Sequence, residues 1–147
     1  MKIQIIAFAG QGTKLMTSLL GKILAQNHIH VYNYTLYGPT MRKGVVSSFL
    51  MTDINEIEVP FFEKSDLLLE FVKTEDALPT AKRIDGNYFL KITKEKLGHA
   101  NMVNFVLLGF LLKQMKVKLN LNKWREYIPK NISKDWEKAL EAGYNCK

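Results

Sequence analysis

Two glycines follow the first apolar segment of the sequence, in the stretch Gly10-Gln11-Gly12. The segment before them, residues 3–9, is almost continuously apolar, as expected of a parallel strand that is buried on both faces. Glycines after such a strand let the backbone approach an anion, and the amides that open the next helix carry partial positive charge. We therefore treat the backbone of this stretch as a candidate anion site, and we expect Thr13 to be the N-cap of the helix that follows. A sharp turn with close helix packing is the alternative.

A second candidate site is the loop after the next predicted strand, which reads Tyr37-Gly38-Pro39-Thr40-Met41-Arg42-Lys43-Gly44. In an α/β sheet, ligands usually bind at the carboxyl ends of the strands. Arg42 would hold a phosphate or a carboxylate through its planar guanidinium group. A solvated loop arginine, or an ion pair with a partner subunit, is the alternative. The candidate ligands in this loop are Tyr37, Gly38, Pro39 and Arg42.

The glycine turn departs from the dinucleotide-binding fingerprint G-x-G-x-x-G. The chain has Ala7 and Ala9 at the first two glycine positions of that fingerprint, and only Gly12 matches it. The fingerprint also requires an acidic residue at the end of the next strand, about twenty residues on. Residues 31–35 contain no Asp or Glu. A stand-alone nucleotide-binding oxidoreductase is therefore kept as an alternative function.

Other chemistry-bearing side chains form no recognisable motif. His28, His30 and His99 have no cysteine or carboxylate at metal-ligand spacing, so the sequence predicts neither a metal site nor an iron–sulfur cluster. Ser47 and Ser48 lack the G-x-S-x-G surroundings of a nucleophile elbow and fit a strand better. We expect no catalytic residue in this chain.

Composition places the chain among globular proteins. Of its 147 residues, 47% are hydrophobic and 24% are charged, which excludes a disordered chain and predicts a single domain over residues 1–147. The formal net charge of +7 favours an anionic partner, which would be a phosphorylated ligand, a nucleic acid or an acidic subunit. The cations of the last third are mixed with acidic residues and accompany no nucleic-acid module. A solvated basic face is expected there, and a nucleic-acid-binding module is kept as an alternative.

The sequence predicts a cytoplasmic protein. Its single cysteine, Cys146, permits no internal disulfide and favours a reducing compartment. The first apolar segment is too short for a signal peptide, and the longest one, residues 103–112, is well below the roughly 18 residues that cross a bilayer.

Strand and helix patterns alternate along the chain. Strands are predicted over 3–9, 29–37, 45–52 and 67–72, and helices over 13–26 and 101–115. Residues 74–83 have a weak helical pattern, and residues 88–92 alternate as a strand would. A closing helix is expected from an N-cap at Ser133 to a terminating Gly143. The fold class is therefore α/β, a Rossmann-like domain with a mostly parallel sheet and flanking helices.

The strongest helix signal, at residues 101–115, is apolar nearly all the way round. Such a helix must be covered on more than one side. We expect the sheet to cover one side and a second chain to cover another.

Four blocks together resemble the gamma subunit, or gamma domain, of the 2-oxoacid:ferredoxin oxidoreductases. Residues 7–12 are similar to the family's G-x-G-G-Q-G turn, and residues 37–48 to its Y-G-P-E-x-R-G-G-x-S segment. Residues 97–109 are similar to its L-G-x-x-x-x-x-N-M-V-x-L-G helix, and residues 136–144 to its closing N-x-x-A-F-x-A-G-Y segment. The blocks follow the family's order. Ala7, Ala9 and Lys43 replace family glycines.

The resemblance implies a non-catalytic subunit of a larger enzyme. In that family, the complex decarboxylates a 2-oxoacid oxidatively, transfers the acyl group to coenzyme A and reduces ferredoxin. The substrates include pyruvate, 2-oxoglutarate, 2-oxoisovalerate and indolepyruvate. Thiamine diphosphate and iron–sulfur clusters are held by partner subunits, so no cofactor is expected on this chain alone. Coenzyme A would be a shared ligand of the complex. By the resemblance, Gly10, Gln11, Gly12, Thr13 and Arg42 would face either such an anionic ligand or the partner subunit.

The resemblance also implies the partners of this chain. They are alpha-, beta- and delta-type subunits of the same complex, with ferredoxin reached indirectly. It implies neither a nucleic acid nor a membrane, and it leaves homodimerisation of the isolated chain open.

Overall fold

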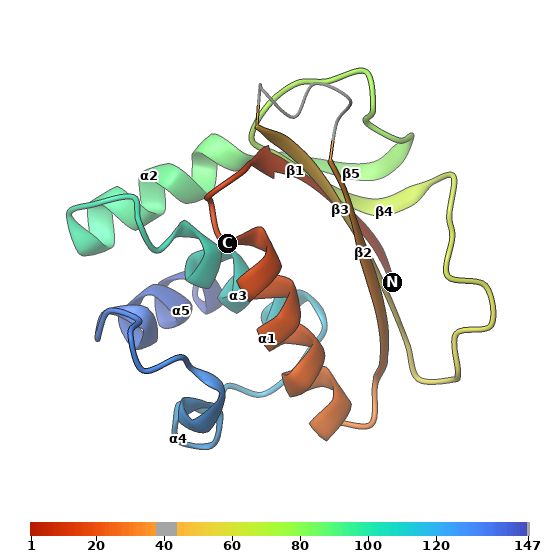
Figure 1. Ribbon diagram of the computed structural model, residues 1–147. Helices are drawn as coiled ribbons and strands as arrows, with labels where there is room; N and C mark the ends of the chain where they lie inside the picture. The colour runs from red at the N-terminus through yellow and green to blue at the C-terminus, as the bar shows by residue number, and fades with distance from the viewer. Residues whose placement is uncertain (38–43, 147) are drawn as a thin grey trace.

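The computed structural model describes residues 1–37 and 44–146, and a five-stranded sheet lies at its centre (Figure 1). The strands are β1 (Lys2–Phe8), β2 (His30–Tyr37), β3 (Val45–Asp53), β4 (Ser65–Glu70) and β5 (Thr80–Asp85). They lie in the order β2-β3-β1-β4-β5. β1 is parallel to β4 and β4 is parallel to β5, whereas β3 is antiparallel to β1 and β2. The predicted α/β fold with a mostly parallel sheet is confirmed.

The βαβ unit predicted at the start of the chain has a strand inserted into it. Helix α1 (Thr13–Gln26) connects β1 to β2, which run in the same direction because both are antiparallel to β3. β3 lies between them, so β2 becomes an edge strand. The parallel neighbour of β1 is therefore β4, from a later part of the chain.

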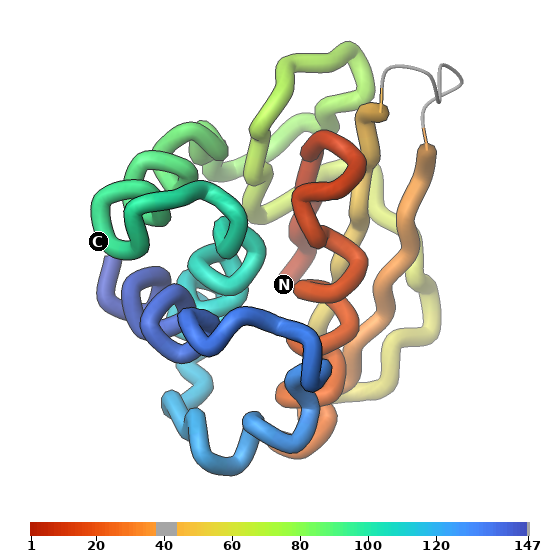
Figure 2. The backbone as a smooth tube through the Cα atoms, turned by 60° about the vertical axis from the view of Figure 1, so that its left-hand side comes forward, coloured from red at the N-terminus to blue at the C-terminus, as the bar shows by residue number. Residues whose placement is uncertain are grey.

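The helices lie on one face of the sheet (Figures 1 and 2). Besides α1 they are α2 (Gly86–Leu97), α3 (Val103–Gln114) and α5 (Trp136–Tyr144), with the short α4 (Leu121–Trp124) and η2 (Arg125–Tyr127) beside them. Residues 103–112 of α3 are all buried, in one core with β1, β4, α1 and α5. The expectation that a second chain covers this helix is therefore wrong, because α1, α2 and α5 of the same chain pack around it.

Two predictions between β4 and α3 are wrong. Thr80–Asp85 overlaps the helix predicted over 74–83, yet it forms β5 and pairs in parallel with β4. Residues 88–92, predicted as a strand, belong to α2, whose N-cap Asp85 accepts a hydrogen bond from the backbone N of Asn87 at 2.8 Å. α2 buries Phe89 and Thr93, which are four residues apart, as on one face of a helix.

The closing helix also differs from its prediction at both ends. α5 begins at Trp136 after the N-cap Asp135, and Ser133 accepts a hydrogen bond from the backbone N of Asp135 at 3.3 Å. Gly143 was expected to end the helix, but it lies inside α5 and is buried. Its neighbours in space explain why a glycine stands there.

Glycines bring α3 and α5 into backbone contact. A Cβ atom placed on Gly143 would lie 1.8 Å from the carbonyl oxygen of Val106. A Cβ atom on Gly109 would lie 2.0 Å from the carbonyl oxygen of Leu140. Each helix therefore supplies one glycine at the crossing, and neither position has room for a side chain.

The opposite face of the sheet is covered by irregular segments. Gln4 of β1 is fully buried, and its Nε2 donates to the carbonyl oxygen of Asp76 at 2.8 Å. The backbone N of Leu78 donates to Oε1 of Gln4, also at 2.8 Å. The one polar residue of the first apolar segment therefore holds residues 76–78 against the sheet.

Replacing Gly143 by alanine should destabilise the protein. Gly143→Ala should lower the free energy of unfolding by about 1–3 kcal/mol, because the added methyl pushes α3 and α5 apart. Gly21→Ala in α1 is the control, since nothing lies within 4 Å of a Cβ there. It should be neutral or stabilise by up to about 1 kcal/mol. Urea unfolding followed by circular dichroism measures both, and equal values for the two variants would contradict the close helix contact.

Candidate functional site

The β1–α1 turn has the backbone form that favours glycine. Gly10 has φ +89° and Gly12 has φ +73°. Oε1 of Gln11 accepts a hydrogen bond from the backbone N of Phe8 at 2.9 Å, and the backbone N of Gln11 donates to the Phe8 carbonyl at 3.2 Å. The Gln11 side chain thus folds back on the end of β1. It fixes the shape of the turn, and the backbone amides of the turn and of the helix start are what the site offers to an anion.

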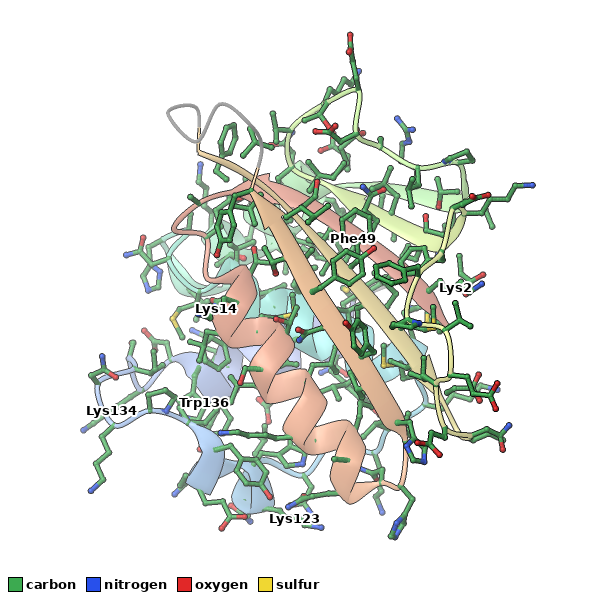
Figure 3. The ribbon with its side chains drawn as sticks, turned by 45° about the vertical axis from the view of Figure 1, so that its right-hand side comes forward. Lys2, Lys14, Phe49, Lys123, Lys134 and Trp136 are labelled. Atoms are coloured by element: carbon green, nitrogen blue, oxygen red, sulfur yellow. The ribbon has the colours of Figure 1, made fainter. Side chains whose placement is uncertain are left out.

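The amino end of α1 is electropositive. Gly12 is its N-cap, and within the described chain no side chain accepts a hydrogen bond from its first amides. Thr13, interpreted from the sequence as the N-cap, is instead the first helical residue. The first turn contains no acidic residue, and it carries the exposed Lys14, labelled in Figure 3. Free amides, the helix dipole and a lysine all favour an anionic ligand here.

A buried asparagine from α3 packs against this turn. A Cβ atom on Gly12 would lie 2.5 Å from Nδ2 of Asn104. Asn104 is 7% exposed, and its Oδ1 has no hydrogen-bond partner among the described residues. An unpaired buried amide oxygen costs about 1–3 kcal/mol, so a water molecule or a ligand donor is expected beside it. Asn104 is not among the site residues predicted from the sequence; its signal there is one polar residue inside the apolar stretch 103–112.

The second predicted loop ends against the same turn. The backbone N of Ala9 donates to the carbonyl oxygen of Gly44, and a Cβ on Gly44 would lie 3.7 Å from that of Ala9. Tyr37 ends β2 at the same edge of the sheet and is 55% exposed. The other predicted ligands of this loop, Gly38, Pro39 and Arg42, lie outside the described residues. Their contact with a ligand stays a prediction.

An acidic residue does lie at the end of the parallel strand next to β1. That strand is β4, and it ends at Glu70, which is 8% exposed. Nη1 of Arg83 donates to Oε2 of Glu70 at 3.3 Å. Both line a cavity of about 240 Å³, together with Lys73, Asp85 and Asn87. The twenty-residue spacing of the fingerprint misses Glu70 because it assumes that the second strand is the neighbour of the first.

The other sequence candidates stay apart from this edge. Nε2 of His99 lies 3.6 Å from Oδ2 of Asp135, and no three metal-ligating side chains come together within residues 1–37 and 44–146. Ser48 shares a hydrogen bond of 3.1 Å with Thr35 of the neighbouring strand, as a strand residue would. Burial raises the pKa of the Cys146 thiol, which lowers its nucleophilic thiolate fraction. None of the described helices is long and apolar enough to span a bilayer.

Solved structures resemble this chain, although no protein-family model and no curated protein matches it. One is the gamma subunit of a keto/oxoacid ferredoxin oxidoreductase from Geobacter sulfurreducens, with 15% sequence identity and a TM-score of 0.67. The alignment covers 97% of this chain and 93% of that subunit. Another is pyruvate oxidoreductase subunit PORC from Thermotoga maritima, with 17% identity and a TM-score of 0.62. That alignment covers 97% of this chain and 94% of PORC.

A third similar structure is the 2-oxoglutarate:ferredoxin oxidoreductase from Magnetococcus marinus, solved with 2-oxoglutarate, coenzyme A and succinyl-CoA bound. Its TM-score is 0.68 at 14% identity, and the alignment covers 98% of this chain but 30% of that longer one. At such low identities the likeness establishes the fold. The chain has the fold of the gamma subunits of 2-oxoacid:ferredoxin oxidoreductases, and the resemblance drawn from the four sequence blocks is confirmed at that level.

The contact between Gly12 and Asn104 can be tested with two alanine variants. Gly12→Ala should lower the free energy of unfolding more than Gly10→Ala does, by about 1–3 kcal/mol. Both variants place a side chain at positive φ, but nothing lies within 4 Å of a Cβ on Gly10. In an Asn104→Ala background, which removes Cγ and Nδ2 and leaves a Cβ 3.3 Å from the added methyl, the difference should fall by more than half. Urea unfolding measures all of these, and a difference that does not fall in that background would contradict the contact.

Proposed function

We propose that this chain is a gamma-type subunit of a cytoplasmic 2-oxoacid:ferredoxin oxidoreductase complex and has no catalytic activity alone. The observation that carries the proposal is that three of the sequence blocks that resemble the family pack on one another in space. The turn of the first block meets the helix of the third at Gly12 and Asn104. The helices of the third and fourth blocks cross at Gly109 and Gly143. The likeness to a gamma subunit over 97% of the chain supports the same proposal.

In the proposed complex, the chemistry takes place on other chains. Alpha-, beta- and delta-type partners hold thiamine diphosphate and the iron–sulfur clusters, and electrons pass from them to ferredoxin. The bound 2-oxoacid is decarboxylated oxidatively and its acyl group is transferred to coenzyme A. The part of this chain is to bind an anionic group of coenzyme A and to join the assembly.

The carboxyl edge of the sheet suits that role. Backbone amides of the β1–α1 turn and Lys14 would bind a phosphate of coenzyme A. Oδ1 of Asn104 would accept a hydrogen bond from the ligand or from a water molecule that it holds. Glu70 would accept a hydrogen bond from a ribose hydroxyl, as the acidic residue beside a nucleotide-binding turn does, with Arg83 as its cationic neighbour.

A stand-alone nucleotide-binding oxidoreductase is the second candidate, because Glu70 occupies the acidic position expected beside β1. Nucleotide binding by the isolated chain distinguishes this candidate from the gamma-type subunit. The isolated chain would then bind a nicotinamide or flavin nucleotide saturably, with no preference for coenzyme A.

Coenzyme A binding should depend on the charge of the glycine turn. Gln11→Glu keeps an oxygen that accepts from the Phe8 amide, but it adds a negative charge beside the phosphate. The dissociation constant for coenzyme A should rise about tenfold or more, which corresponds to at least about 1.4 kcal/mol. Gln114→Glu makes the same change at the far end of α3 and should leave binding unaltered. Calorimetric titration measures both, and equal constants for the two variants would remove the turn from the site.

The proposed subunit role predicts which proteins copurify with the native chain. The chain purified from its own organism should bring down partners that contain thiamine diphosphate and iron–sulfur clusters, in fixed ratio to it. Visible absorption, cofactor analysis and 2-oxoacid-dependent reduction of ferredoxin check this. A chain recovered alone under gentle, low-salt conditions would contradict the proposed function.

A further inference from the structure

The sheet has helices on one side only. In Figures 1 and 2, α1, α2, α3 and α5 lie on the same face, and the segments around 54–64 and 71–79 run along the other as irregular chain. Parallel sheets are normally covered by helices on both faces, whereas antiparallel pairs such as β2–β3 can leave one face open. On the face away from the helices, irregular chain is the only cover among the described residues, and it leaves apolar side chains of β2 exposed.

An aromatic patch lies on that face. It consists of Tyr32, Tyr34 and Leu36, which alternate along β2, and of Phe61. The Tyr34 ring stacks on Phe49, which Figure 3 labels, with centroids 4.7 Å apart. It also lies 5.6 Å from the ring of Phe61 and 6.1 Å from that of Tyr32. Phe61 is 65% exposed and Leu36 is 55% exposed. Contiguous apolar side chains exposed in this way mark a surface that binds another molecule.

The acidic loop, which we define as residues 53–66, contributes Phe61 to the patch, and its carboxylates flank Phe61 along the chain. It contains five acidic residues and one lysine, a net charge of −4 in a chain whose net charge is +7. Glu56, Glu58 and Glu63 are exposed, and none of them forms an ion pair with a described residue. The patch therefore has an apolar centre and an acidic rim.

We propose that the aromatic patch is a docking surface for a different protein chain, one that presents an apolar centre surrounded by lysines and arginines. The charge of the rim selects this occupant. A second copy of this chain would meet the patch through a two-fold axis, which places acidic loop against acidic loop. A nucleic acid would be repelled by the same carboxylates. A partner with a basic rim satisfies both the apolar centre and the charge.

This surface lies on the face of the sheet away from the helices, whereas the glycine turn lies at the carboxyl edge. The proposed function says that the chain has partners, and the docking surface says where one of them binds. The surface would bind such a partner whether or not the complex oxidises 2-oxoacids.

Charge reversal of the rim provides the test. The tagged full-length chain is expressed in its own organism as wild type, as the triple variant Glu56→Lys, Glu58→Lys, Glu63→Lys, and as a control triple variant. The control is Glu95→Lys, Glu126→Lys, Glu141→Lys, which makes the same charge change at exposed positions of α2, η2 and α5. Circular dichroism and urea unfolding confirm that all three fold.

The amount of stoichiometric partner recovered with each chain is then measured at low and high salt. The rim variant should retain at most one tenth of the partner that the wild type and the control retain, and salt should weaken the wild-type complex. A carbodiimide, which joins carboxylates to nearby amines, should cross-link the acidic loop to lysines of that partner.

Three results would overturn the docking surface: equal retention by the two triple variants, cross-links that avoid the acidic loop, or recovery of the wild-type chain without a stoichiometric partner. Cofactor analysis of the recovered partner tests the proposed function separately from the docking surface. A rim-dependent partner without thiamine diphosphate or iron–sulfur clusters would contradict the proposed function and leave the docking surface standing.

Discussion

The close approach of α3 to its neighbours determines how the rest of the chain is arranged. Gly109 and Gly143 let the backbones of α3 and α5 touch, and Gly12 lets the β1–α1 turn reach Asn104 at the start of α3. α3 is buried along residues 103–112, so the surrounding helices and the sheet pack on all its sides. The glycine turn is part of the same packing. Its glycines therefore serve the fold and shape the candidate site at once, and the two interpretations of the turn drawn from the sequence are compatible.

Hydrophobic periodicity predicted the strands and helices that are strongly buried. It failed for elements whose structure depends on pairing with a neighbouring strand. β1 and α3 are apolar enough to be recognised from their residues alone. Thr80–Asp85 is mostly exposed and carries three charged side chains, so only its pairing with β4 makes it a strand. α2 was mistaken for a strand because its half-buried Leu90 and Ile92 alternate with other residues, while its buried Phe89 and Thr93 follow the helical period.

The candidate site also has a part that the sequence predicts and a part that it does not. The turn at residues 10–13 is formed by neighbouring residues, and its glycines indicate it in the sequence. Asn104 and Glu70 reach the same edge from elements far along the chain. The packing of α3 against the turn places Asn104 there, and the strand order places Glu70. The net charge of +7 is the sum of an acidic loop and a basic remainder of the chain. We therefore expect an anionic ligand and a positively charged partner to bind at different surfaces.

β1 joins the irregular segment at residues 76–78 to the glycine turn. Through Gln4 it holds residues 76–78 on the face away from the helices, and four residues further on it becomes the glycine turn. A strand in the middle of a sheet is stiff, since it is paired on both sides and cannot bend without breaking both ladders. A displacement of residues 76–78 would therefore reach the glycine turn as a shift of the whole strand.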